Sequence, residues 1–293
     1  MTASNFVRPR LLDLFCGPGG AGRGYADAGF EVVGVDIVHQ PHYPFEFVRG
    51  EALLALQRYG SEFDAIHASP PCQAFTAYRR RPGHVAERPD LITPLRPLLE
   101  ATGLPYVIEN VPGAPLLDPV CLCGSSFGLN VRRHRLFESN VPLLDLPCRH
   151  GWQTARYAPA TNRRNRRRTV EVGVWRIPLA VQKRAMGVEW DVDEDLSEMV
   201  PPAYTHFLGA QIVARLEVAA TVSRPLVATD DLVWRMRERP IVRRRWRSEL
   251  RASGRIESAR AVTPLRRRYA AKHGTACGAR GRNGRNAARK RNR

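Results

Sequence analysis

The stretch Arg10-Leu11-Leu12-Asp13-Leu14-Phe15-Cys16-Gly17-Pro18-Gly19-Gly20 decides the fold, because an apolar run leads directly into a glycine-rich turn. The run 10–15 predicts a short buried strand. Glycines let the backbone turn tightly and approach a ligand, and the residues up to Gly29 favour a helix. The apolar run 31–36 predicts a second strand that ends in Asp36. This order of elements predicts an α/β fold.

The same stretch predicts a nucleoside site. An acidic residue at the end of the second strand accepts the ribose hydroxyls in nucleotide-binding α/β folds, and Asp36 has that place. The glycines are more compressed than the Gly-x-Gly-x-x-Gly of dinucleotide enzymes, and this spacing favours S-adenosyl-L-methionine (SAM). Glu51, which opens the next element, is a candidate partner of the adenine amino group. The alternatives are a purely structural glycine turn and, for Glu51, a solvated glutamate at a helix start.

A cysteine follows the next predicted strand. The run 63–66 leads into His67-Ala68-Ser69-Pro70-Pro71-Cys72-Gln73, and the two prolines end the strand because neither has an N–H group for a sheet ladder. Cys72 is therefore expected on a loop above the sheet, where open α/β sheets bind ligands. Ordinary core packing is the alternative for a single cysteine.

A carboxyl group is expected beside that thiol. A helix over about 90–101 and a strand over 104–108 precede Glu109-Asn110-Val111-Pro112. One strand–helix–strand unit separates Cys72 from Glu109, so adjacent parallel strands would place both groups in one cleft. Further on, Arg133, Arg135 and Phe137 alternate, which predicts one face of a strand. Two guanidinium groups on that face enter a polar cleft or form a surface ladder.

Four motifs in this order resemble the DNA cytosine-5 methyltransferase family. They are Asp13-Leu14-Phe15-x-Gly17-x-Gly19-Gly20, Pro70-Pro71-Cys72-Gln73, Glu109-Asn110-Val111 and Arg133-x-Arg135. The resemblance continues at 186–188 and 200–204 and covers roughly residues 10–217. The chain departs from the family at Glu198-Met199, where Gly-Asn is usual, and in the short stretch between Phe137 and Arg176.

The resemblance implies methyl transfer from SAM to carbon 5 of cytosine in DNA, as in restriction–modification systems. It implies that the base is flipped out of the stack and attacked by Cys72. The other catalytic residues that it implies are Glu109, Arg133 and Arg135. The cofactor contacts that it implies are Phe15 against adenine, Gly17 and Gly19 near the methionine part, and Asp36 on the ribose.

We expect a Rossmann-like SAM-dependent methyltransferase sheet of parallel strands with helices on both faces, in a chain divided into four parts. Residues 1–137 would form the SAM-binding and catalytic domain, and 138–176 a short target-recognition region that holds the basic run 163–168. Residues 177–220 would return to complete the catalytic domain, with a helix near 205–216 that packs on it. Residues 221–293 would form a basic, partly disordered tail that binds nucleic acid.

The net charge of +18 is confined to that tail. Residues 232–293 contain 21 Lys and Arg but 3 Asp and Glu, whereas the first 231 residues contain 25 of each sign. Arginines interleaved with aromatic residues bind polyanions with an affinity that falls with salt. DNA is the expected partner and RNA an alternative, for a chain expected to be a monomer.

The remaining features concern compartment and metals. We see no secretory signal and no apolar run long enough to span a membrane, and six cysteines in 293 residues do not indicate a disulfide scaffold. A cytoplasmic location in a prokaryotic or phage-infected cell fits these features. Cys121-x-Cys123 and Cys148-x-His150 offer two pairs of soft ligands, but their spacing is not a standard zinc pattern. We assign no metal from the sequence and leave zinc open.

Three other functions stay open at this point. An RNA cytosine-5 methyltransferase would have the same motifs. Amino-group methyltransferases also place Ser-Pro-Pro at a strand end, as at 69–71, but follow it with an aromatic residue where this chain has Cys72. A protein without catalytic activity that binds nucleic acid on this scaffold is the third alternative, and it would not turn SAM over.

Overall fold

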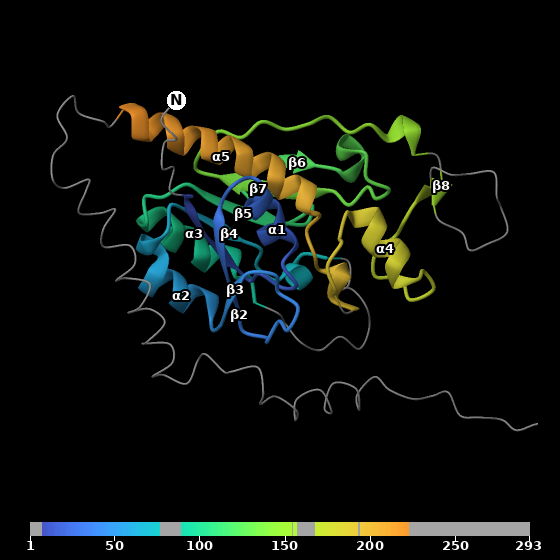
Figure 1. The fold of residues 1–293 in the computed structure, drawn as a ribbon, viewed down its shortest axis with the longest axis horizontal. Coiled ribbons are helices and arrows are strands. Elements are labelled where there is room, and N and C mark those ends of the chain that lie inside the picture. The colour runs from blue at the N-terminus through green and yellow to red at the C-terminus, as the bar shows by residue number, and fades with distance from the viewer. Residues whose placement is uncertain (1–7, 77–88, 154, 157–167, 193, 223–293) are drawn as a thin grey trace, which may run out of the picture. The chain divides into compact units, whose positions relative to one another are not determined.

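The computed structural model describes residues 8–76, 89–153, 155–156, 168–192 and 194–222 (Figure 1). The expected basic tail, apart from its first two residues, lies outside these ranges, and so does nearly all of the basic run 163–168. Among the described helices, none combines the length and the apolar character needed to cross a membrane.

One mixed sheet of seven strands, in the order β3-β2-β1-β4-β5-β7-β6, forms the centre of the described part. Strands β1 to β5 are parallel, and β7 runs antiparallel to β5 and β6. The α/β fold predicted from the sequence is confirmed, whereas the expectation of parallel strands is wrong for β7. The strands are β1 Arg10–Leu14, β2 Glu31–Asp36, β3 Glu46–Arg49, β4 Ala65–Ala68, β5 Tyr106–Asn110, β6 Val120–Leu122 and β7 Arg135–Ser139, with a separate pair of β8 Ala155–Arg156 and β9 Arg168–Thr169.

Helices cover both faces of the sheet, as expected. Successive side chains of a strand point to opposite faces. Leu11 of β1 accordingly packs in one core cluster with Tyr25, whereas Leu12 packs in another with Leu56 and Leu95. The first cluster lies under α1 and α5, and the second under α2 and α3. The helices are α1 Gly20–Asp27, α2 Ala52–Tyr59, α3 Ile92–Ala101, α4 Leu179–Met186 and α5 Pro202–Val222.

Two strands extend further than the apolar runs that predicted them. Strand β4 continues to Ala68, and β5 continues through Glu109 to Asn110. The apolar pattern stops earlier because the last residues of these strands are polar or small. Glu109 nevertheless stays in the ladder because β7 pairs with it on the other side, opposite Phe137. Glu109 therefore lies within a strand and not on the loop after it.

Helix α5 packs closely on α1 and contains the helix expected near 205–216. A β-carbon at Gly24 of α1 would overlap the carbonyl oxygen of Pro202 and Oγ1 of Thr205. The Thr205 hydroxyl also donates a hydrogen bond of 2.9 Å to the carbonyl of Ala21. The two helices thus meet backbone to backbone, and glycine is the residue that allows it.

Replacing Gly24 by alanine tests this contact. We expect Gly24→Ala to lower the free energy of unfolding by about 1–3 kcal/mol, because the added methyl overpacks a tight interface. Gly50→Ala is the matched control, because a β-carbon there would find its nearest neighbour, Val35 Cγ1, at 4.0 Å. Urea unfolding followed by circular dichroism measures both. Equal stability of the two variants would contradict the contact.

Candidate active site

Cys72 lies just past the carboxyl end of β4. It begins a short 3-10 turn, Cys72–Ala74, that follows the two prolines. The side-chain amide of Asn110, at the end of the neighbouring strand β5, donates a hydrogen bond of 2.9 Å to the carbonyl of Pro70. The loop that carries the thiol is therefore tied to the strand that carries Glu109.

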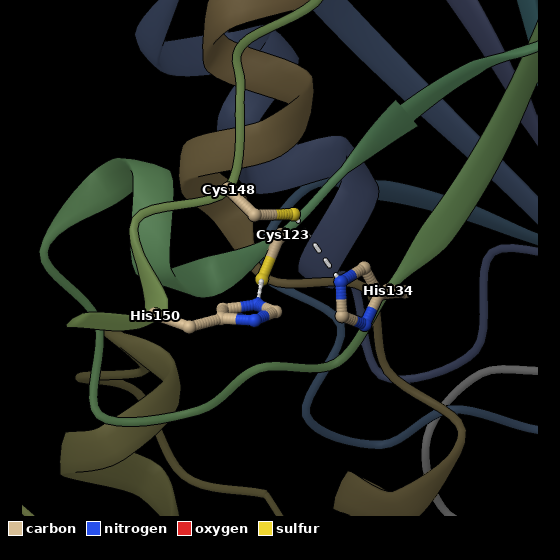
Figure 2. Close-up of side chains that lie close together, drawn as sticks. All are labelled: Cys123, His134, Cys148 and His150. Carbon is tan, nitrogen blue, oxygen red and sulfur yellow. Dashed lines mark hydrogen bonds between the residues drawn. The ribbon is translucent and has the colours of Figure 1, made fainter. Parts of the chain in front are cut away.

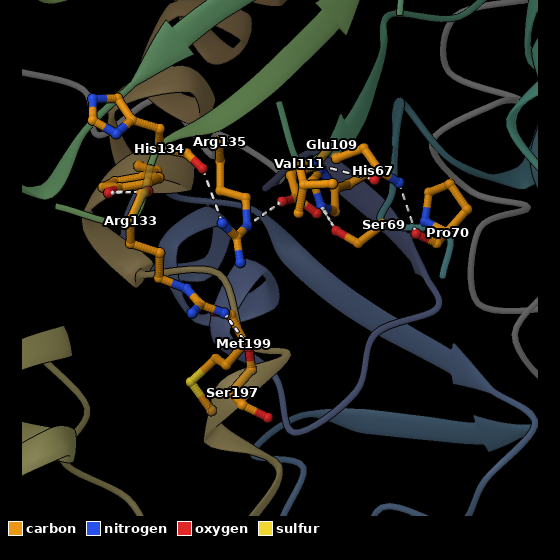
Figure 3. Close-up of polar contacts among 12 residues, drawn as sticks. His67, Ser69, Pro70, Glu109, Val111, Arg133, His134, Arg135, Ser197 and Met199 are labelled. Atoms are coloured by element: carbon orange, nitrogen blue, oxygen red, sulfur yellow. Dashed lines mark hydrogen bonds and ion pairs between the residues drawn. The ribbon is translucent and has the colours of Figure 1, made fainter. Parts of the chain in front are cut away.

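Glu109 and Arg135 form a buried ion pair. Arg135 Nε lies 3.1 Å from Glu109 Oε1, and the two side chains are 14% and 7% exposed (Figure 3). Burial raises the pKa of Glu109, while the charge of Arg135, a hydrogen bond with Ser69 and the charge of Arg133 act in the opposite direction. Desolvation prevails, so this carboxyl group holds its proton to a higher pH than a surface glutamate does.

The thiol of Cys72 is half-buried in the same place. Burial raises its pKa, and the charges of Glu109 and Glu198 raise it further. The charge of Arg135 lowers it. Arg135 is therefore the cation that favours the thiolate, and in the protein alone the thiol form is favoured over the nucleophilic thiolate.

The expectation that Arg133 shares a strand face with Arg135 is wrong. Strand β7 begins at Arg135, and Arg133 precedes it with a φ of +41°. Its guanidinium donates hydrogen bonds to the carbonyl oxygens of Met199 (2.9 Å) and Ser197, whereas that of Arg135 points to Glu109 (Figure 3). Burial and the charge of Arg135 lower the pKa of Arg133 to about 9. Arg133 thus fixes the 197–199 segment against the site.

A buried polar chain behind Glu109 was missed from the sequence. His67, which is fully buried in β4, lies between the hydroxyl of Tyr25, 3.1 Å from Nδ1, and the hydroxyl of Ser69, 2.8 Å from Nε2. Burial lowers the pKa of His67 to about 3, so the ring is neutral. The side chain of Ser69 in turn is hydrogen-bonded to Glu109. A histidine inside the otherwise apolar run 65–68 was the only available signal.

The residues expected to hold a nucleoside meet at the ends of β1 and β2. The Asp36 carboxylate accepts hydrogen bonds from the backbone N–H of Gly17 (3.0 Å) and of Val38 (2.8 Å). Gly17 has a φ of +48°, and a β-carbon there would meet no atom within 4 Å. The carboxylate and the uncrowded backbone beside it fit a ribose and the close approach of a cofactor.

Phe15 and Gly19 shape the same turn, with φ of +56° and +92°. A β-carbon at Gly19 would lie 2.7 Å from Pro44 Cδ, so the backbone passes close to the 43–44 segment. Glu51 has a different place: its carboxylate accepts the N–H groups of Leu53 (3.0 Å) and Leu54 (2.7 Å) and caps α2. Of the two alternatives for Glu51, the structure shows the helix start.

Asp13 lies beneath this turn and was quoted in the sequence only as part of a motif. Its Oδ2 accepts a hydrogen bond of 3.0 Å from the Tyr43 hydroxyl, and its buried Oδ1 has no hydrogen-bond partner in the described part of the chain. Burial raises the pKa of Asp13 to about 7. The hydrogen bond with Tyr43 lowers this pKa, and the charge of Asp36 raises it. An unpartnered buried acceptor beside the turn is a further feature that suits a ligand carrying donors.

The pKa of Asp13 predicts a pH dependence of stability. A carboxyl whose pKa is raised in the folded state stabilises the fold below its unfolded value near 4, and this contribution is lost as the pH rises through about 7. Asp13→Asn removes the titration and keeps an oxygen for Tyr43. We expect the variant to gain stability relative to the wild type between pH 4.5 and 7.5, by about 4 kcal/mol at most. Urea unfolding at both pH values measures the gain, and a constant difference would contradict it.

Glu198, at a position where the chain departs from the family that it resembles, lies beside Gln73 and Cys72. It accepts a hydrogen bond of 3.0 Å from the side-chain amide of Gln73, and its charge raises the pKa of Cys72. The sequence analysis noted that Glu198-Met199 stands where the family usually has Gly-Asn, but it gave Glu198 no role. In the structure it is an acidic group beside the nucleophile candidate.

Replacing Glu198 by glutamine tests that influence. The variant keeps an oxygen for Gln73 but loses the charge, so the pKa of Cys72 should fall and iodoacetamide should alkylate it severalfold faster at pH 7.5. The measurement is the labelled fraction of the Cys72 peptide by mass spectrometry over a pH series. Glu100→Gln, on the exposed side of α3, is the matched control and should leave the profile unchanged. A Glu198→Gln profile that matches the wild type would contradict the prediction.

The structure brings together three of the four residues of the pattern Cys121-x-Cys123 and Cys148-x-His150. Cys123, Cys148 and His150 lie close to one another, and the fourth member of the group is His134, not Cys121 (Figure 2). Cys121 lies in β6 opposite Leu136.

Comparisons with known proteins agree with the resemblance carried by the motifs. No protein-family model matches the chain. A type II methyltransferase, M.XorII of Xanthomonas oryzae pv. oryzae, is 28% identical over 151 residues, which cover 46% of this chain and 32% of the relative. The chain thus spans about a third of this curated relative. The predicted resemblance to methyltransferases is confirmed by this match.

Solved structures of methyltransferases are also similar to parts of the chain. A DNA modification methyltransferase encoded within an E. coli prophage is 26% identical and has a TM-score of 0.35, with 44% of this chain and 45% of that chain covered. Dnmt2 of S. pombe is 14% identical and has a TM-score of 0.48, with 72% and 99% covered.

Proposed function

We propose that this protein transfers a methyl group from SAM to carbon 5 of cytosine in DNA. The observation that carries the proposal is the meeting of a thiol, a buried carboxyl group and a guanidinium where the neighbouring strands β4, β5 and β7 come together, in Cys72, Glu109 and Arg135. The order of the motifs supports the same reaction, and the curated type II methyltransferase relative supports methyl transfer.

Glu109 has the properties needed to hold the base. Burial raises its pKa. When the carboxyl takes up a proton, it donates a hydrogen bond to ring N3 of cytosine while its other oxygen accepts one from the amino group. Negative charge develops on the ring as a nucleophile adds to carbon 6, and a donor fixed in a buried site stabilises it strongly. Arg135 holds Glu109 in that orientation.

Cys72 is the proposed nucleophile. Its thiolate adds to carbon 6, and the Sγ–C6 bond converts carbon 5 into an enamine-like centre that takes the methyl group. Loss of the proton on carbon 5 and cleavage of the Sγ–C6 bond restore the aromatic ring. The thiol form of Cys72 is favoured in the protein alone. The positive charge of Arg135 lowers the pKa of this thiol and so assists its ionisation.

The glycine turn is the proposed cofactor site. SAM, when bound, supplies an electrophilic methyl group. Asp36 would accept the ribose hydroxyls, Phe15 would stack on the adenine, and the backbone at Gly17 and Gly19 would lie along the methionine part. The uncrowded Gly17 position and the carboxylate beside it support this placement.

DNA is the proposed substrate. The target base has to leave the stack to reach a thiol above the sheet, at a cost of a few kcal/mol. The excess of 18 positive charges in residues 232–293 would repay part of that cost through phosphate contacts that weaken with salt.

The test is methyl incorporation by the purified full chain from tritiated SAM into DNA and into RNA, with the modified base identified by mass spectrometry. We expect 5-methylcytosine in DNA. Cys72→Ser should reduce the rate by roughly a thousandfold or more, because serine is a far poorer nucleophile at neutral pH. SAM binding, measured by calorimetry, should persist in this variant. Cys121→Ser, a thiol in β6, is the matched control and should retain activity.

Other products would assign another function. N6-methyladenine or N4-methylcytosine would replace the proposed chemistry by amino-group methylation, and label in RNA alone would replace the substrate. Retained activity of Cys72→Ser would exclude the covalent step. SAM binding without label on any substrate would favour a protein that only binds nucleic acid.

A further inference from the structure

Four potential metal ligands converge outside the proposed active site. They are Cys123 after β6, His134 before β7, and Cys148 and His150 near the end of the segment that follows β7 (Figure 2). Their ligand atoms all lie within 4.8 Å of one another. Two thiols and two imidazoles are a ligand set of structural zinc sites.

The register of the sheet brings the first two ligands together. In the antiparallel pair β6–β7, Cys121 lies opposite Leu136 and Leu122 opposite Arg135. The next pair along the same register is Cys123 and His134. Side chains at directly opposed positions of antiparallel strands are neighbours, which explains why His134 joins Cys123 in the group.

Two of the distances between ligand atoms fit one tetrahedral ion. Cys123 Sγ lies 3.3 Å from His150 Nε2, and Cys148 Sγ lies 3.3 Å from His134 Nε2. Around a tetrahedral zinc ion with ordinary bond lengths, sulfur and nitrogen ligands lie about 3.5 Å apart. The two imidazoles meet edge to face, with ring centroids 5.3 Å apart and planes at 84°, so each can direct a nitrogen to a common centre from its own side.

The surroundings suit a structural ion. Cys123 is fully buried and its sulfur lies 3.1 Å from the hydroxyl of Ser125, which accepts a hydrogen bond of 3.0 Å from the N–H of Arg149. Such second contacts orient ligands and are usual at metal sites. Cys148 is exposed, which gives an ion access to the group from solvent.

The segment between β7 and the 3-10 turn His150–Trp152 has no regular secondary structure. A metal ion that joins Cys148 and His150 to Cys123 and His134 would tie this irregular segment to the sheet. His134 also separates Arg133 from Arg135, so the same ion would fix the backbone that carries both arginines.

We propose that Cys123, His134, Cys148 and His150 bind one structural Zn²⁺ ion. The two thiols release their protons to solvent as their sulfurs bind, and the two histidines bind as neutral rings through Nε2. All four positions are taken by protein ligands, as in closed structural sites and unlike catalytic zinc.

The test measures metal in the tag-free full chain expressed with added zinc. We expect one zinc per chain by mass spectrometry of the elements, and at least a tenfold lower content in Cys148→Ser and in His150→Ala. Cys121→Ser is the matched control, because Cys121 lies in β6 outside the group, and this variant should keep one zinc. Neither DNA nor SAM enters this measurement, so its outcome does not depend on the proposed methyl transfer.

A second measurement uses the wild type alone, in case the variants fold poorly. Cobalt(II) added to metal-free protein should give the intense visible bands of tetrahedral coordination together with a thiolate charge-transfer band, and zinc should displace both. Less than about a tenth of an equivalent of zinc, or cobalt bands of octahedral intensity, would overturn the proposal. Equal zinc in the two ligand variants and in Cys121→Ser would overturn it as well.

Discussion

The ion pair of Glu109 and Arg135 is the interaction on which the arrangement of the candidate site depends. It joins β5 to β7, the strand whose direction reverses, and it places a cation beside the thiol at the end of β4. Two charges removed from water are costly unless each satisfies the other. The pair is therefore retained only while both strands keep their register, which couples the geometry of the site to the integrity of the sheet edge.

Two sets of polar contacts lie around this pair, one on each side of Glu109. Behind Glu109, a neutral His67 links Ser69 to Tyr25 of α1, so the carboxyl rests on groups that carry no charge of their own. In front of it, Arg133 binds the carbonyls of residues 197 and 199 and holds the segment that leads into α5. Arg135 thus lowers the pKa values of Glu109 and Cys72, whereas Arg133 holds the 197–199 segment in place.

Local sequence patterns predicted the parts of the fold that depend on neighbours along the chain. Apolar runs located β1, β2, β4 and β5 but not β3 or β6, and glycines and prolines located the turns that carry Phe15 and Cys72. The features that were wrong or missed depend on pairing between distant segments. The register of β6 with β7 places His134 beside Cys123, and the second neighbour of β5 keeps Glu109 inside a strand. No pattern within a single run carries that information, and the burial of His67 and Asp13 is set by the same distant packing.

The backbone contact of α1 with α5 has a consequence for how the chain is made. Ala21 and Thr205, which share a hydrogen bond, are 184 residues apart. At about 5–20 residues per second, a ribosome needs about 10–40 s to make that length of chain. For all of this time the apolar side of α1 lacks its partner, so α1 stays uncovered until α5 has been made. A nascent chain of this protein is thus exposed to chaperones and proteases longer than its early strands alone would suggest.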